Sequence, residues 1–166
     1  SRESWLEYLN YNIESLNDDD ELIVLGVLTK SQSKVVRSIF AELKSESFDF
    51  GLNHGDLSLK NVIVDESGKA NLVDWGSAEA SIVPHHDLIQ LLKMNMLEND
   101  PDNAAIRSFL EGYGMSLSEF QQMRPTLDSL LVLRAFDKLR WALASGIDGL
   151  ENYIAHAKQA LERKLN

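Results

Sequence analysis

The stretch His54-Gly55-Asp56-Leu57-Ser58-Leu59-Lys60-Asn61 and the later stretch Val73-Asp74-Trp75-Gly76 decide how this chain is interpreted. The residues between them predict a β-hairpin, because two β-type runs flank a turn that contains glycine. The runs are Val62-Ile63-Val64 and Leu72-Val73, and the turn is Asp65-Glu66-Ser67-Gly68. Since a hairpin reverses the direction of the chain, we expect it to bring Asn61 and Asp74 back toward each other.

Three polar side chains in these stretches suit metal-assisted phosphoryl transfer. A carboxylate at Asp56 can accept the proton of a substrate hydroxyl, and Asn61 and Asp74 offer the oxygen ligands that Mg²⁺ prefers. Taken singly, each of the three is more often a turn or cap residue. The ordered set, with a hairpin between its parts, favours a site instead, because this reaction needs positioning and neutralisation of charge above all.

These residues carry a family resemblance that covers roughly residues 52–92. The catalytic loop of the aminoglycoside phosphotransferase and choline kinase group resembles His54-Gly55-Asp56 with Asn61. The metal-binding segment of that group is similar to Val73-Asp74-Trp75 with Ala78, and the pair that opens its next helix is similar to Asp87-Leu88. Protein kinases resemble the chain less, because no arginine precedes Asp56 and no lysine stands two places after it.

The resemblance implies an ATP-dependent enzyme that phosphorylates a hydroxyl of a small molecule, such as an aminoglycoside or an amino-alcohol. In this interpretation Asp56 is the catalytic base, and Asn61 and Asp74 hold Mg²⁺. Asp87 either braces the catalytic loop from outside the site or is a plain helix N-cap.

Two neighbours of these residues are expected to support the site. His54 is expected to fix the backbone of its loop by a hydrogen bond, with Gly55 allowing the tight turn beside it. Lys60 is expected to contact the transferring phosphate of the nucleotide, or else to be a solvated surface lysine.

Apolar periodicity and helix signals predict a mostly α chain with one small hairpin, which is an α+β fold. The resemblance makes this the C-terminal catalytic lobe of a protein kinase-like fold. A serine at 31 or 33 is expected to cap the third helix. The predicted helices cover residues 5–16, 21–30, the stretch from the serine cap to about residue 45, 87–97, 102–113, a short segment opened by Ser116-Leu117-Ser118-Glu119, 126–144 and 150–164.

Composition bounds the class of protein. With 166 residues, of which 44% are hydrophobic and 8% aromatic, we expect one globular domain over residues 1–166. A net charge of −10 argues against nucleic-acid and membrane partners and favours a neutral or cationic substrate. The sequence contains no cysteine, which excludes disulfides and agrees with a cytoplasmic location.

The nucleotide-binding half of the resembled enzymes is not recognisable in the sequence. The residues before His54 read mainly as helix, and neither Lys30 nor Lys34 has the strand setting of the lysine that grips the nucleotide. We therefore expect an N-terminal lobe to be absent and the chain to be inactive alone. Apolar residues that the lobe would cover, namely Leu22, Ile23 and Leu25, are then expected to drive self-association.

A catalytically silent module that binds a small molecule or a partner is the competing hypothesis. The presence of all three polar groups favours an active parent enzyme, because binding alone does not require them. In the resembled group the late helices form the acceptor pocket. The candidate pocket residues are Glu98, Asp100, Asp102, Glu111 and Trp141, each of which also fits a solvated helix face or a core position.

Overall fold

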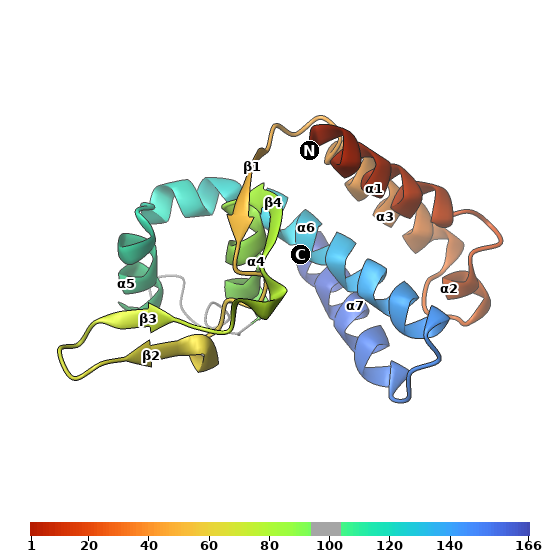
Figure 1. Cartoon of the computed structure of the whole chain (residues 1–166). Helices are drawn as coiled ribbons and strands as arrows, with labels where there is room; N and C mark the ends of the chain where they lie inside the picture. Colours follow the sequence, from red (N-terminus) through yellow and green to blue (C-terminus); the bar gives the residue numbers. More distant parts are fainter. Residues whose placement is uncertain (94–103) are drawn as a thin grey trace. The chain divides into compact units, whose positions relative to one another are not determined.

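The computed structural model describes residues 1–93 and 104–166 and shows a mostly helical chain with small antiparallel sheets (Figure 1). Its helices are α1 (Arg2–Ser15), α2 (Glu21–Val24), α3 (Lys30–Glu42), α4 (His85–Lys93), α5 (Ala104–Tyr113), α6 (Leu117–Ala144) and α7 (Leu150–Leu165). Its strands are β1 (Asp49–Asn53), β2 (Val62–Val64), β3 (Ala70–Leu72) and β4 (Glu79–Val83), with 3-10 turns η1 (Leu59–Asn61) and η2 (Trp75–Ser77). The expected α+β class is confirmed at this level.

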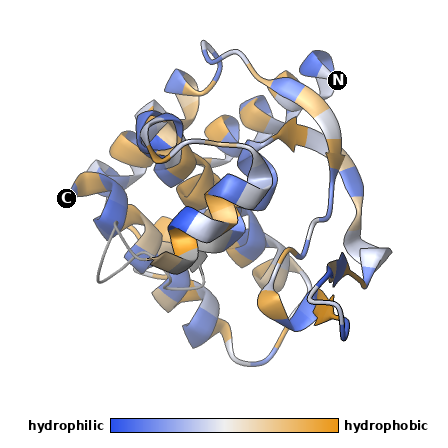
Figure 2. Cartoon of the chain, turned by 90° about the vertical axis from the view of Figure 1, so that its left-hand side faces the viewer, coloured by the Kyte–Doolittle hydropathy of each residue, from blue (hydrophilic) through white to orange (hydrophobic). Residues whose placement is uncertain are grey.

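The chain divides into two compact units. The first consists of residues 1–47 and 125–166, and the second of residues 48–124. Hydrophobic and hydrophilic residues alternate along the helices, as expected when one face of each helix is buried (Figure 2). None of the helices within the described residues has the length and apolar character needed to cross a membrane.

The first unit is entirely helical and contains α1, α2, α3, α7 and the part of α6 that begins at Pro125. Its helix α3 begins at a capping box, in which the Thr29 hydroxyl accepts the Gln32 N–H and the Gln32 side chain accepts the Thr29 N–H. The predicted cap at Ser31 or Ser33 is therefore wrong. Ser33 instead lies buried within the helix.

A buried ion pair joins α2 to α6 within this unit. The Arg140 guanidinium donates two hydrogen bonds, of 2.8 and 2.7 Å, to the two carboxylate oxygens of Asp20. The Asp20 side chain is fully buried, and its Oδ1 also accepts the N–H of Leu22 at the start of α2. One carboxylate thus caps a helix and neutralises a buried cation.

The segment around α2 differs from its prediction. A helix over residues 21–30 is expected from the sequence, but α2 ends at Val24 and residues up to α3 form turns. Leu22 is buried, so the expectation that it is uncovered is wrong. Leu25, 54% exposed, is uncovered as predicted, and the neighbouring Val24 is exposed at 78%.

The second unit holds both sheets, each of two antiparallel strands. β2 pairs with β3 in the register Val62↔Leu72, which confirms the predicted hairpin. The pairing of β1 with β4, from Asp49↔Val83 to Asn53↔Glu79, is not predicted from the sequence. Because β1 contains Asp49, Gly51 and Asn53, its strand propensity is low, and only the long-range pairing makes it a strand.

Helix α6 is one continuous helix of 28 residues, whereas the sequence predicts a short helix and a separate one from Thr126. Pro125 lies inside it and supplies no N–H to the helical ladder. Its carbonyl oxygen accepts hydrogen bonds from Ser129 Oγ at 3.1 Å and Lys164 Nζ at 2.9 Å. The predicted capping box does open α6, with Ser116 and Glu119 bonded to each other.

Candidate active site

The loop that follows β1 is tied to the segment that follows β3 through the imidazole of His54. His54 Nε2 lies 2.9 Å from the carbonyl oxygen of Val73 and donates to it, while Nδ1 accepts the N–H of Asp56 at 3.3 Å. These two bonds need a neutral ring protonated at Nε2. The ring also packs against Trp75, with centroids 4.8 Å apart. His54 thus lies where the sequence predicts a loop-fixing role.

Gly55 lets the loop approach η2 more closely than any other residue would allow. Its φ is +81°, and a Cβ added there would overlap the carbonyl oxygen of Ser77. The Gly55 carbonyl accepts a hydrogen bond of 3.1 Å from Gln90 Nε2 on α4. Ser77 and Gln90 are supporting residues that the sequence gives no reason to single out, since their importance comes only from the tertiary contact.

Asp87, in the first turn of α4, contacts the backbone of the same loop. Its Oδ1 accepts the N–H of His54 at 3.2 Å and that of Gly55 at 3.4 Å, and its Oδ2 lies 3.3 Å from the His54 nitrogen. The sequence leaves two roles open for Asp87, a brace of the catalytic loop or a helix N-cap. The bonds to His54 and Gly55 are the ones that the bracing role requires. Asp87 is also near Tyr113, where burial and the negative charge of Asp87 raise the pKa of the tyrosine.

Asp56 and Asn61 contact each other directly. Asn61 Nδ2 donates to the Asp56 carbonyl at 2.8 Å and to Asp56 Oδ2 at 3.2 Å. Lys60 Nζ lies 3.0 Å from Asp56 Oδ2, in a pair whose side chains are 69% and 43% exposed. The hydrogen bond from Lys60, assisted by that from Asn61, holds the pKa of the Asp56 carboxyl below its usual value.

A backbone hydrogen bond links the segment that carries Asp74 to Asn61. The Asn61 carbonyl accepts the N–H of Val73 at 2.9 Å, which fixes the residue before Asp74. Asp74 itself has φ +61° and ψ +60°, a left-handed conformation that is uncommon outside glycine but that aspartate adopts more readily than most residues. Its side chain makes no capping hydrogen bond to η2 and is exposed.

The donor set fits a magnesium ion better than a transition metal. Over residues 1–93 and 104–166, no three His, Cys, Asp or Glu side chains gather as a ready-made metal cluster. The Asp74 carboxylate and the Asn61 amide are instead oxygen donors of the kind that Mg²⁺ prefers, and Mg²⁺ completes such a shell with water and phosphate oxygens. Because Asn61 turns Nδ2 toward Asp56, its Oδ1 is left for a cation. Convergence of Asp74 on the same ion stays a prediction.

Comparison with known proteins indicates the family to which this chain belongs. The model of the phosphotransferase enzyme family (APH) matches residues 2–126, about three quarters of the chain. The chain belongs to this family. The match includes the whole second unit and therefore every residue predicted for catalysis, magnesium binding or support of the loop, but not Trp141. No curated protein and no solved structure matches it.

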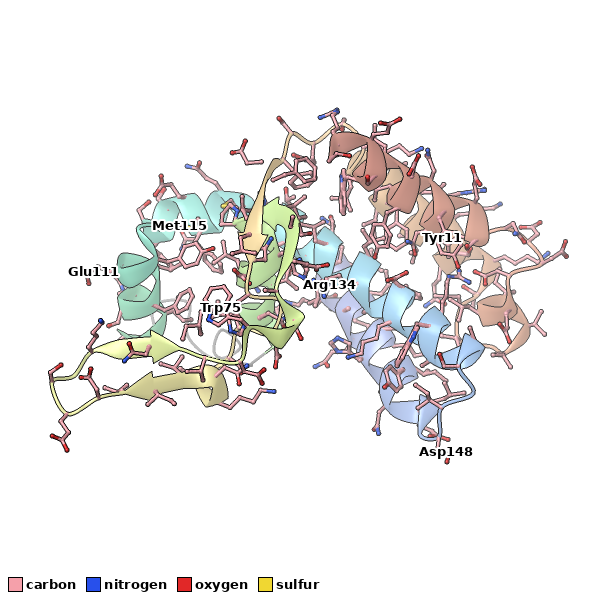
Figure 3. The ribbon with its side chains drawn as sticks, in the orientation of Figure 1. Tyr11, Trp75, Glu111, Met115, Arg134 and Asp148 are labelled. Carbon is pink, nitrogen blue, oxygen red and sulfur yellow. The ribbon has the colours of Figure 1, made fainter. Side chains whose placement is uncertain are left out.

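The predicted acceptor residues are placed less completely. Glu98, Asp100 and Asp102 lie outside the described residues. Glu111 is exposed on α5 (Figure 3), and Trp141 is 55% exposed on α6, so it is not a core tryptophan. Trp75, 48% exposed next to Asp74, is a further aromatic residue at the site, with its indole N–H donated to the Leu72 carbonyl.

Proposed function

We propose that this member of the phosphotransferase family transfers the terminal phosphoryl group of ATP to a hydroxyl of a small molecule. The observation that carries the proposal is the direct contact of Asp56 with Asn61, in a loop that His54 ties to the residue before Asp74. A candidate base and two candidate oxygen ligands then belong to one connected structure. A neutral or cationic acceptor, such as an amino sugar or an amino-alcohol, suits the net charge of −10.

Asp56 orients the acceptor hydroxyl and takes its proton. Because Lys60 and Asn61 lower its pKa, Asp56 is ionised at neutral pH and is ready to accept a hydrogen bond from the hydroxyl. A base of low pKa is suited to a reaction in which the phosphoryl group is largely detached before the hydroxyl proton must leave. Lys60 lies close enough to Asp56 to reach a phosphate held at the same point.

Asn61 and Asp74 would hold magnesium through Asn61 Oδ1 and the Asp74 carboxylate. Bound magnesium neutralises the charge on the phosphate oxygens. Asp87 and His54 act through the loop: the carboxylate fixes the backbone before Asp56, and the imidazole fixes both the Asp56 N–H and the Val73 carbonyl. Precise positioning of these groups supplies the rate enhancement.

The 166 residues alone are expected to turn over slowly. Their first 47 residues form helices α1 to α3 and contain no glycine-rich loop that would cover the phosphates of a nucleotide. A nucleotide held only by metal ligands is poorly aligned for transfer. The proposal therefore pairs this unit with a nucleotide-binding lobe, and turnover is to be measured on the protein made from its whole coding region.

The decisive experiment compares ATP turnover of the wild-type protein and of Asp56→Asn with a panel of amino sugars and amino-alcohols. We expect the variant to lose a factor of about 10² to 10⁴ in kcat, the usual contribution of a general base. The competing hypothesis, a silent binding module, predicts acceptor binding with no turnover by either protein. Equal nonzero rates for the two proteins would show that Asp56 is not the base.

A further inference from the structure

Helices α1 and α3 of the first unit carry exposed stripes of opposite charge. Within its bounds α1 has three acidic residues and one basic residue, whereas α3 has three basic residues and one acidic residue. The members of the two stripes are all exposed, and they are Glu3, Glu7 and Glu14 on α1 and Lys30, Lys34 and Arg37 on α3. Since residues four, seven or eleven positions apart share a helix face, each stripe runs along one side of its helix.

The two stripes do not neutralise each other within one chain, although their helices are neighbours. Helices α1 and α3 pack against each other and run in opposite directions (Figure 1). Lys30 pairs with Asp18 at 3.6 Å, which places the beginning of α3 beside the end of α1. The side chains of Lys34 and Arg37, and all three glutamates of the α1 stripe, form no ion pair with any residue in the described ranges 1–93 and 104–166.

An exposed aromatic ring lies within the acidic stripe. Tyr11 is 59% exposed on α1 (Figure 3), four residues after Glu7 and three before Glu14, so it shares their face of the helix. On α3, Val35 is 37% exposed. Tyrosine is enriched at protein interfaces, where its ring is buried and nearby charges select the partner. The α1–α3 face, defined by these two residues and the two charged stripes, is therefore suited to a protein partner.

We propose that the α1–α3 face is the interface of a symmetric dimer, in which α1 of each copy packs against α3 of the other. A second copy is the partner that the charges favour, because the chain itself carries both members of the complementary pair. A two-fold axis that runs between the two helices and along them makes the same contact twice. Since α1 and α3 are antiparallel, Glu14 then faces the beginning of the second copy's α3, and Glu7 faces its middle, near Arg37. The alternative of α1 on α1 would bring like charges together and is disfavoured.

The test measures the oligomeric state of the protein from its whole coding region by sedimentation velocity over a range of concentrations. The wild type is expected to form a dimer. Two double variants each reverse one stripe, Glu7→Lys with Glu14→Lys on α1 and Lys34→Glu with Arg37→Glu on α3. Either variant alone is expected to dimerise about a hundredfold more weakly, because like charges then face each other in both contacts. An equimolar mixture of the two variants is expected to form a heterodimer, since each stripe again meets its opposite.

The matched control is Asp148→Lys with Glu151→Lys, at exposed residues of the same unit outside the α1–α3 face. It changes the net charge as much as the α1 variant does and is expected to dimerise like the wild type.

Other outcomes overturn the proposal. A wild type that stays monomeric excludes the dimer, and a dimer that survives both reversals has its interface elsewhere. Loss of the dimer in Leu25→Ser but not in the reversed variants places the contact at the turn after α2. A mixture that stays monomeric excludes charge pairing between the stripes. Because a misfolded variant forms no heterodimer, a heterodimer in the mixture also shows that both variants are folded. None of these outcomes bears on the proposed phosphoryl transfer, which is tested separately by ATP turnover.

Discussion

The carboxylate of Asp87 lies 3.2 Å from the backbone nitrogen of His54, so the first turn of α4 holds the start of the loop that carries Asp56. The two residues are 33 positions apart in the sequence. Asp87 also receives the N–H of Gly55, and it is nearly buried, so its bonds to the loop are shielded from water. A single side chain thus fixes the backbone direction from which Asp56 is presented.

Replacing Asp87 is expected to reduce activity and stability together. Asp87→Ala leaves the N–H groups of His54 and Gly55 without partners, which costs about 1–3 kcal/mol of the free energy of unfolding. Turnover falls further than acceptor affinity, since the loop is displaced. Urea unfolding and steady-state kinetics check this. The control is Asp65→Ala, because Asp65 also accepts backbone N–H groups but only within the β2–β3 turn. Equal kinetics for Asp87→Ala and Asp65→Ala would show that Asp87 does not act by holding the catalytic loop.

Gly55 and Gly68 form a matched pair for testing the close approach of the loop to η2. Both have a positive φ, +81° and +83°, so an alanine at either position is strained by about 1–2 kcal/mol. At Gly68 the added Cβ meets nothing within 4 Å, whereas at Gly55 it overlaps the Ser77 carbonyl. We expect Gly55→Ala to be clearly less stable than Gly68→Ala and to lose activity. Similar unfolding midpoints in urea would show that the approach is not close.

The sequence predicts those parts of this structure that depend on local pattern. The β2–β3 hairpin follows from two apolar runs around Gly68, and most helices follow from their periodicity. The sequence also contains the signal for the cap of α3, because Thr29-x-x-Gln32 is a capping box just before an apolar pattern. A serine nearer to that pattern is, however, the more obvious candidate. The error there is one of choice between signals.

Other parts depend on contacts between distant segments, which no local pattern encodes. β1 is a strand because Asn53 and its neighbours pair with β4, about thirty residues away. The continuity of α6 through Pro125 depends on tertiary packing as well as on the helix itself. Within the site, Asp87 could be singled out from the family resemblance alone, and Gln90 could not be singled out at all.

The buried pair of Asp20 and Arg140 is expected to be a main determinant of stability in the first unit. Asp20→Ala removes the partner of a largely buried guanidinium and also the cap of α2, so we expect a loss of about 3–5 kcal/mol. Urea unfolding measures it. The control is Asp18→Ala, since Asp18 pairs with Lys30 at 3.6 Å on the exposed surface, where such pairs contribute less than about 1 kcal/mol. Comparable losses of stability for Asp20→Ala and Asp18→Ala would contradict the claim that the buried pair contributes more than the exposed one.

Lys60 is expected to set the pH at which Asp56 becomes protonated. The Lys60 hydrogen bond lowers the pKa of Asp56, so the ionised carboxylate is retained as the pH falls and is lost only on passing through this lowered pKa. In Lys60→Gln the pKa of Asp56 rises toward its usual value. Carboxyl NMR titration of Asp56 is expected to show this rise, and the acid limb of kcat/KM moves to higher pH in parallel. The control is Lys69→Gln, on the hairpin, which is expected to change neither the pKa of Asp56 nor the acid limb.

Two outcomes would contradict this prediction. A pKa of Asp56 that is the same with and without the Lys60 ammonium would mean that the ion pair does not persist in solution. A shifted pKa without a shifted acid limb would mean that another group limits the rate.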